Sequence, residues 1–167
     1  DLDQYAEWDK VVKMNPDKPM VPSEFGLCEP AFAGGDARRN GIFLEKMTCY
    51  RKYPNIAGTI YFCLNDYRTQ MGEEGEGKFR QRVHGSTDLC GNPKPSYYTV
   101  SEECAPVILE KEAGQIKVTC RNALPSYTVQ GYRLLILDKE NKKEIQIPKL
   151  LPGMSWTTIL EKENITV

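Results

Sequence analysis

The pattern of apolar residues changes at Cys104-Ala105-Pro106, and this change most constrains what the chain can fold into. Before it, helical periodicity alternates with short apolar strands, which is typical of β/α units. After it come five short β-rich runs separated by turn residues, which is typical of an all-β domain. We therefore predict a boundary between residues 103 and 104. The five runs are Val107–Leu109, Ile116–Cys120, Tyr132–Leu137, Glu144–Ile147 and Ser155–Leu160.

The first part is expected to contain three helices and two strands. Helices are predicted over residues 3–14, from Asp36 as N-cap to about Arg51, and from Pro93 to about Glu103. Met20–Ser23 is predicted to be a strand. Ala57–Leu64 is almost wholly apolar, as a strand buried on both faces should be. Residues 65–84 are expected to form a long loop.

Composition excludes several classes of function. The 22 basic and 23 acidic residues give a formal net charge of -1, which offers no basic face for nucleic acid. No apolar run approaches the roughly 20 residues that cross a bilayer. The six cysteines contain no close pair of the kind that binds metal; isolated buried thiols are favoured over disulfides, and the redox compartment stays open.

One carboxylate stands at the end of the first predicted strand, in Ser23-Glu24-Phe25-Gly26. In a parallel barrel the carboxyl ends of the strands carry the chemistry, so Glu24 is a candidate catalytic group. From spacing alone, the alternative is that Glu24 is hydrogen-bonded in a loop or at the start of a helix and has no catalytic role. A complete barrel needs about 250 residues, so 167 residues can hold only part of one.

Three motifs in this order resemble glycoside hydrolase family 2, the family of β-galactosidases and β-glucuronidases. The resemblance implies the last two β/α units of a TIM (β/α)8 barrel over residues 1–103. An incomplete immunoglobulin-like β-sandwich over residues 104–167 would follow, in agreement with the rhythm of its five runs. Both ends of the chain are expected to be cut. The motifs are Ser23-Glu24-Phe25-Gly26, the passage from Ile56 to Arg68, and Gly85-Ser86-Thr87-Asp88 followed by Gly91-Asn92-Pro93-Lys94-Pro95.

The resemblance implies a retaining mechanism with Glu24 as nucleophile. The acid/base Glu of the family lies in an upstream Asn-Glu pair, which the 167 residues do not contain. Where the family usually has a sugar-lining Trp, Phe62 or Cys63 stands here. No organic cofactor is implied. A divalent or monovalent metal ion near the site is common in the family, but the sequence holds no ligand cluster for one. The residues expected to line the sugar site are Tyr61, Phe62, Asn65, Asp66 and Arg68.

The sequence thus predicts a fragment of a retaining β-glycosidase, most like a β-galactosidase, that acts on terminal β-linked sugars. The alternatives are a non-catalytic carbohydrate-binding or assembly module and a degenerate relative without activity. His84, the only histidine, is expected to be a structural residue or, less favoured, a polar group near the sugar. The expected partners are a carbohydrate and either a second copy or the missing part of a longer chain, with no nucleic acid or membrane. Periplasmic, secreted and cytoplasmic locations all stay open.

Overall fold

The computed structural model describes residues 4–26, 35–73, 80–137 and 142–159. The chain divides into two compact units, Asp1–Cys104 and Ala105–Val167. The described elements are three helices and seven strands, and every named strand pairing is antiparallel. We describe each unit by itself.

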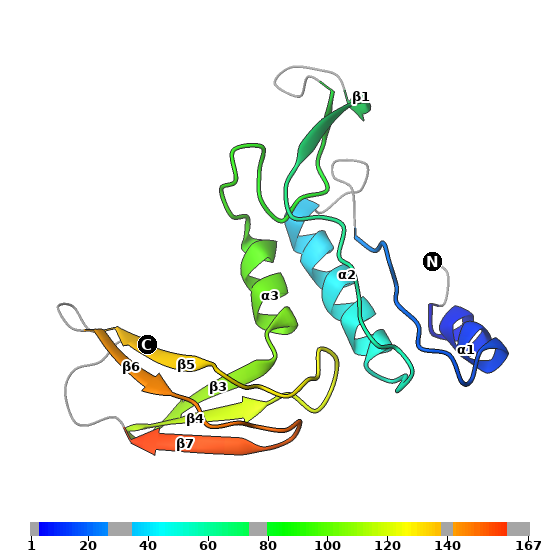
Figure 1. Ribbon diagram of the computed structural model, residues 1–167. Coiled ribbons are helices and arrows are strands. Elements are labelled where there is room, and N and C mark those ends of the chain that lie inside the picture. Colours follow the sequence, from blue (N-terminus) through cyan, green and yellow to red (C-terminus); the bar gives the residue numbers. More distant parts are fainter. Residues whose placement is uncertain (1–3, 27–34, 74–79, 138–141, 160–167) are drawn as a thin grey trace. The chain divides into compact units, whose positions relative to one another are not determined.

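Three helices of the first unit lie close to their predicted ranges: α1 spans Gln4–Met14, α2 spans Gly35–Tyr50 and α3 spans Pro95–Cys104. Helices α2 and α3 run side by side (Figure 1). At their amino ends the Asp36 carboxylate accepts hydrogen bonds from the Ser96 backbone N–H at 2.8 Å and hydroxyl at 2.7 Å. At their carboxyl ends Arg51 pairs with Glu103 at 2.5 Å. The prediction that Asp36 caps α2 is therefore wrong, because its carboxylate joins two helices instead.

The two predicted strands of this unit are less regular than expected. They meet in parallel at two isolated bridges, Met20 with Ile56 and Phe25 with Tyr61. Backbone hydrogen bonds of 2.8–2.9 Å join the two segments between these points. Pro22 has no N–H group to donate, so a continuous ladder cannot form through it.

The predicted long loop over residues 65–84 contains an antiparallel hairpin, so that prediction is wrong in part. Strand β1 spans Tyr67–Glu73 and pairs with β2, Gln81–Arg82. Residues 74–79, which hold the acidic Gly-Glu run, lie outside the described residues. The hairpin directly follows the second parallel segment and so begins at the end where Glu24 stands.

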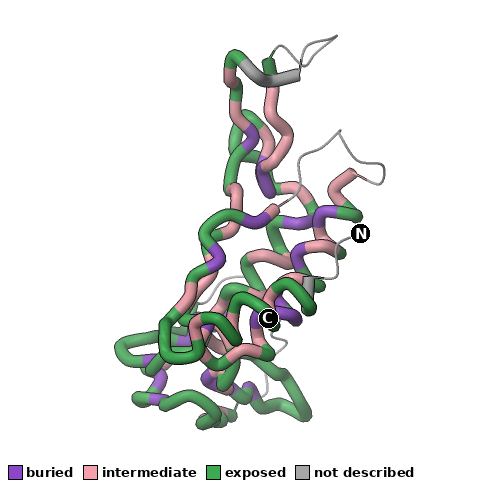
Figure 2. The backbone as a smooth tube through the Cα atoms, turned by 90° about the vertical axis from the view of Figure 1, so that its right-hand side faces the viewer, coloured by how far each residue is buried: buried purple, intermediate pink, exposed green. Residues whose placement is uncertain are grey.

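The second unit consists of two antiparallel sheets around one core, and its strands confirm the five predicted runs. One sheet has the order β3 (Val107–Glu112), β4 (Gln115–Cys120) and β7 (Ser155–Ile159), and the other pairs β5 (Arg133–Leu137) with β6 (Lys142–Gln146). Buried and exposed residues alternate along β4 and β5 (Figure 2). Trp156 packs against the core. The core residues are Ile116, Val118, Cys120, Val129, Leu134, Ile136, Ile147 and Leu150.

This core gives a stability prediction. Ile116 is 2% exposed, whereas Ile108 on the opposite face of the same sheet is 39% exposed. Ile116→Ala should lower the free energy of unfolding of this unit by about 2–5 kcal/mol, because it leaves a cavity. Ile108→Ala is the matched control and should cost well under half of that. Urea unfolding followed by Trp156 fluorescence measures both, in a Trp8→Phe background because the sequence holds a second tryptophan in the first unit. Equal losses would contradict the assigned faces.

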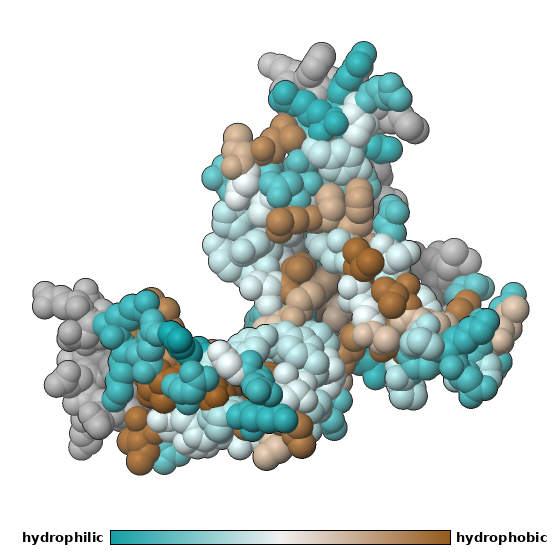
Figure 3. All heavy atoms as spheres, viewed as in Figure 1, coloured by the Kyte–Doolittle hydropathy of each residue, from teal (hydrophilic) through white to brown (hydrophobic). Residues whose placement is uncertain are grey.

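Some apolar side chains stay uncovered within the described residues (Figure 3). Leu135 and Leu137 are 45% and 56% exposed on the outer face of β5, and Val21 and Ile60 are 50% and 55% exposed on the parallel segments. None of the described helices is both long and apolar enough to span a bilayer. Val21 and Ile60 are therefore apolar side chains of the parallel segments that no other described residue covers.

Candidate active site

Glu24 lies in an open hollow of about 170 Å³ in the first unit. The hollow is formed at the carboxyl ends of the two parallel segments. Glu24 itself is solvent-exposed. The other lining residues are Phe25, Gly26, Lys46, Phe62 and His84. The structure therefore brings the predicted nucleophile and one predicted sugar-lining residue, Phe62, to the same cavity.

Glycine at position 26 is required by the close approach of the two segments. A Cβ atom built on Gly26 would lie 2.0 Å from the carbonyl oxygen of Phe62. No side chain can be accommodated at that distance. Gly26 thus lets the backbone after Glu24 lie directly against Phe62, so that both residues border the same hollow.

Tyr61 lies on the opposite side of its segment from Phe62, as alternation along an extended chain requires. Its ring packs against Phe43 at 5.3 Å and Phe25 at 5.8 Å between centroids. Phe25 also contacts Tyr50, and burial raises the pKa of the Tyr50 hydroxyl to about 12. The expected sugar contact of Tyr61 is not found in the hollow, because the ring belongs to the packing between the segments and α2.

Asp66 is buried, and its carboxylate is used within the protein. One oxygen accepts from the Gly85 backbone N–H at 2.8 Å and pairs with the Lys94 ammonium at 2.9 Å. The other accepts from the Gln81 amide at 3.2 Å. A Cβ at Gly85 would lie 2.2 Å from the Asp66 nitrogen, so this turn also needs glycine. Asp66 holds the base of the hairpin rather than lining the hollow.

Asn65 and Arg68, the remaining predicted sugar-site residues, are exposed and also lie outside the lining of the hollow. The Asn65 amide donates to the Asp88 carbonyl at 3.4 Å. Arg68 lies in β1 opposite Gln81. Of the five residues expected to line the sugar site, the structure thus places only Phe62 beside Glu24.

Two further residues line the hollow, Lys46 and His84. Lys46 was not predicted from the sequence, and His84 was placed near the sugar only in the less favoured of its two interpretations. Lys46 lies on α2, where a Lys has no distinguishing pattern. The sequence signal for His84 is its position directly before the Gly85-Ser86-Thr87-Asp88 motif. The His84 ring contacts Phe62 at 5.4 Å and stacks on Tyr67 at 5.8 Å.

The segment that carries His84 is anchored by a buried arginine. Arg39 on α2 is 1% exposed, and its guanidinium donates to the Val83 carbonyl at 2.7 Å. The same guanidinium pairs with Asp36 at 2.7 Å, and Asp36 in turn holds Ser96 at the start of α3. His84 is therefore held beside the hollow by a chain of charge-assisted hydrogen bonds.

Burial lowers the pKa of His84 below its ordinary value of 6.5, and the nearby charges of Arg82 and Arg39 lower it further. The carboxylates of Glu24 and Asp66 act in the opposite direction. His84 is therefore neutral at pH 7.

This gives a prediction for the pKa of His84, whose NMR signal can be assigned directly because the sequence holds one histidine. NMR titration of the imidazole should give a pKa below 6.5. Glu24→Gln should lower that pKa further because it removes a negative charge, and Arg82→Gln should raise it because it removes a positive one. A pKa unmoved by Glu24→Gln would contradict the proximity of the two groups.

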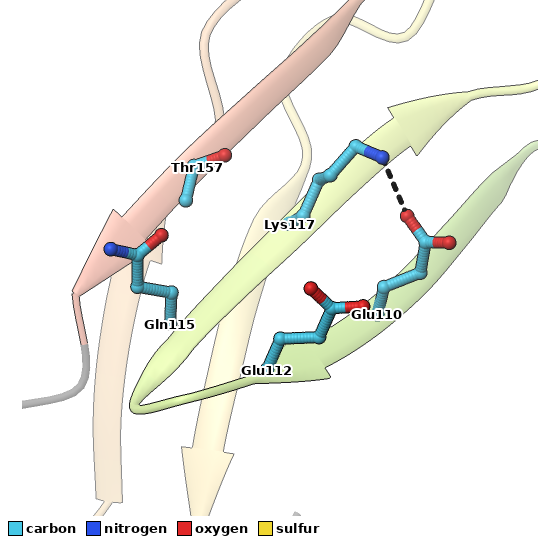
Figure 4. Close-up of a pocket in the computed structure, with 5 residues that line it drawn as sticks. All are labelled: Glu110, Glu112, Gln115, Lys117 and Thr157. Carbon is cyan, nitrogen blue, oxygen red and sulfur yellow. Dashed lines mark hydrogen bonds and ion pairs between the residues drawn. The ribbon is translucent and has the colours of Figure 1, made fainter.

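A second hollow, of about 120 Å³, lies on the outer face of the three-stranded sheet in the second unit. Figure 4 shows side chains from β3, β4 and β7 standing on this face, with Lys117 pairing with Glu110 at 2.8 Å. Lys117 and Glu110 are about half exposed, so water screens their charges. Among the described residues no group of three or more His, Cys, Asp or Glu could hold a metal ion. The hollow at Glu24 is the better candidate for chemistry, because it places a carboxylate beside aromatic rings at the ends of two parallel segments.

Comparison with known proteins gives a structural likeness only. No family model matches the chain, and no curated protein matches it in sequence. Among solved structures, the chain is similar to an FMN-binding β-glucuronidase from Facaelibacterium prausnitzii L2-6, with a TM-score of 0.51 and 14% sequence identity. The match covers 95% of this chain but only 26% of that one. The fold of this chain is thus like that of a quarter of a longer glycosidase.

Proposed function

We propose that these residues are part of a retaining β-glycosidase in which Glu24 is the nucleophile. In such a reaction the carboxylate attacks the anomeric carbon and forms a covalent glycosyl ester, which water then hydrolyses. The observation that carries the proposal is the position of Glu24. It stands at the carboxyl end of a segment paired in parallel, in a hollow with an aromatic ring beside it.

The parallel segments also support the proposal that they belong to a (β/α)8 barrel. Helix α2 connects the two segments, as the helix of a β/α unit does. The exposed faces of Val21 and Ile60 would then be covered by further barrel strands of a longer chain. The two sheets of the second unit would form the incomplete immunoglobulin-like sandwich after the barrel. The general acid/base would lie outside these 167 residues.

Two sugars are candidates. A β-galactoside is the substrate expected from the family resemblance, which is greatest to a β-galactosidase. Lys46 in the hollow favours a β-glucuronide, because its ammonium group would attract the carboxylate of a uronic acid, and the similar solved structure bears the name of a β-glucuronidase. The two candidates differ only in the ligand and share the role of Glu24.

Covalent trapping tests the function and separates the sugars. The longer protein is incubated with a 2-fluoro β-galactoside or a 2-fluoro β-glucuronide, each with a good leaving group, and its intact mass is measured. A stable mass increase from one reagent, located on the peptide of Glu24 and absent from Glu24→Gln, is the expected result. Labelling by neither reagent, with no turnover, would favour a non-catalytic binding or assembly module.

A further inference from the structure

Three rings gather beside Glu24. Phe62 contacts His84 and Tyr67 edge-on at 5.4 and 5.8 Å, and His84 stacks on Tyr67 with an interplanar angle of 23°. Phe62 and His84 line the hollow, whereas Tyr67 on β1 supports them from outside its lining. Aromatic pairs at these separations stabilise each other, so the three rings hold one another in place.

We propose that Phe62 and His84 together form two aromatic walls against which the sugar ring packs, with His84 as a further substrate-binding residue. The proposal rests on the proposed function. One face of a pyranose presents C–H groups, and such a face packs on an aromatic surface in binding sites. The His84 ring stands at 78° to the Phe62 ring, so the two rings form adjacent walls of the hollow rather than one flat surface. One wall would contact the C–H face of the sugar and the other would contact its edge.

The surroundings of His84 suit this role. Arg39 fixes its backbone through the Val83 carbonyl, so the ring does not need to be ordered when the sugar binds. The charged groups around it are Arg82, Arg39, Glu24, Asp66 and Lys46. Burial keeps the imidazole neutral at pH 7, and a neutral ring does not form an ion pair that would lower the nucleophilicity of Glu24.

The test uses the longer enzyme with whichever glycoside it cleaves. His84→Ala should raise KM by about three- to tenfold, the size of one aromatic contact, and should change kcat less. His84→Leu, which keeps most of the volume but has no aromatic face, should do the same if the alanine variant folds poorly. His84→Phe should restore KM to within about twofold of the wild-type value. Tyr98→Ala removes a 63% exposed ring outside the hollow and is the matched control.

The outcomes distinguish the proposed role of His84 from the proposed function of Glu24. If Glu24→Gln abolishes turnover while His84→Ala, His84→Leu and Tyr98→Ala all keep the wild-type KM, the role of His84 is overturned and the function of Glu24 stands. If the KM of His84→Phe is as high as that of His84→Ala, His84 acts through a specific contact of its imidazole and the proposed packing is overturned. If no glycoside is cleaved or bound, the function and the role of His84 are overturned together.

Discussion

Glu24→Gln is expected to lower kcat of the longer enzyme by about 10⁴-fold or more, because it removes the nucleophile rather than a binding contact. KM should change far less, since glutamine fills the same space in the hollow. The effect is measured by steady-state kinetics on an alkyl glycoside, because both formation and hydrolysis of the glycosyl ester then need catalysis. The readout should be kcat and KM separately, so that loss of binding is not mistaken for loss of chemistry.

Glu7→Gln is the matched control, because Glu7 is an exposed glutamate on α1 and the chemical change is identical. It should leave both constants unchanged. A loss below about tenfold in Glu24→Gln corresponds to only about 1.4 kcal/mol in the barrier. A loss that small would rule out Glu24 as nucleophile, even if the variant binds sugar normally.

The 167 residues alone are expected to show no measurable hydrolysis of an alkyl β-galactoside or β-glucuronide. The family resemblance places the acid/base Glu upstream of this sequence, and protonation of the leaving oxygen typically contributes about 10²–10⁴-fold. The measurement is release of the alcohol by the purified chain, compared at equal concentration with the longer enzyme.

An activated aryl glycoside serves as the control substrate, since its leaving group needs little protonation and reports on the nucleophile alone. Slow release from the aryl glycoside, lost in Glu24→Gln, would agree with a chain that holds half of a catalytic pair. Robust cleavage of the alkyl glycoside, abolished by Glu24→Gln, would show instead that both catalytic groups lie within these residues.

The secondary structure of this protein could be predicted from its sequence where one pattern dominates. Periodic apolar residues predicted α1 and α2, and β-rich runs separated by turn residues predicted the five strands of the second unit. The prediction failed at Asp36 and over residues 65–84. Asp36 has the residue type of a cap, yet its carboxylate is satisfied by Ser96, 60 residues away. A contact at that sequence separation leaves no local pattern.

The site divides in the same way. The sequence by itself placed Glu24 at the end of an extended segment and Phe62 at the end of another, because strand ends and alternation are local properties. Only the tertiary structure decided which side chains join them. Asp66 and Tyr61 are used in packing and ion pairing, whereas His84 and Lys46 come to the hollow from a turn and a helix. The physical reason is that burial and charge partners depend on contacts between segments distant in sequence, and a single sequence does not record those contacts.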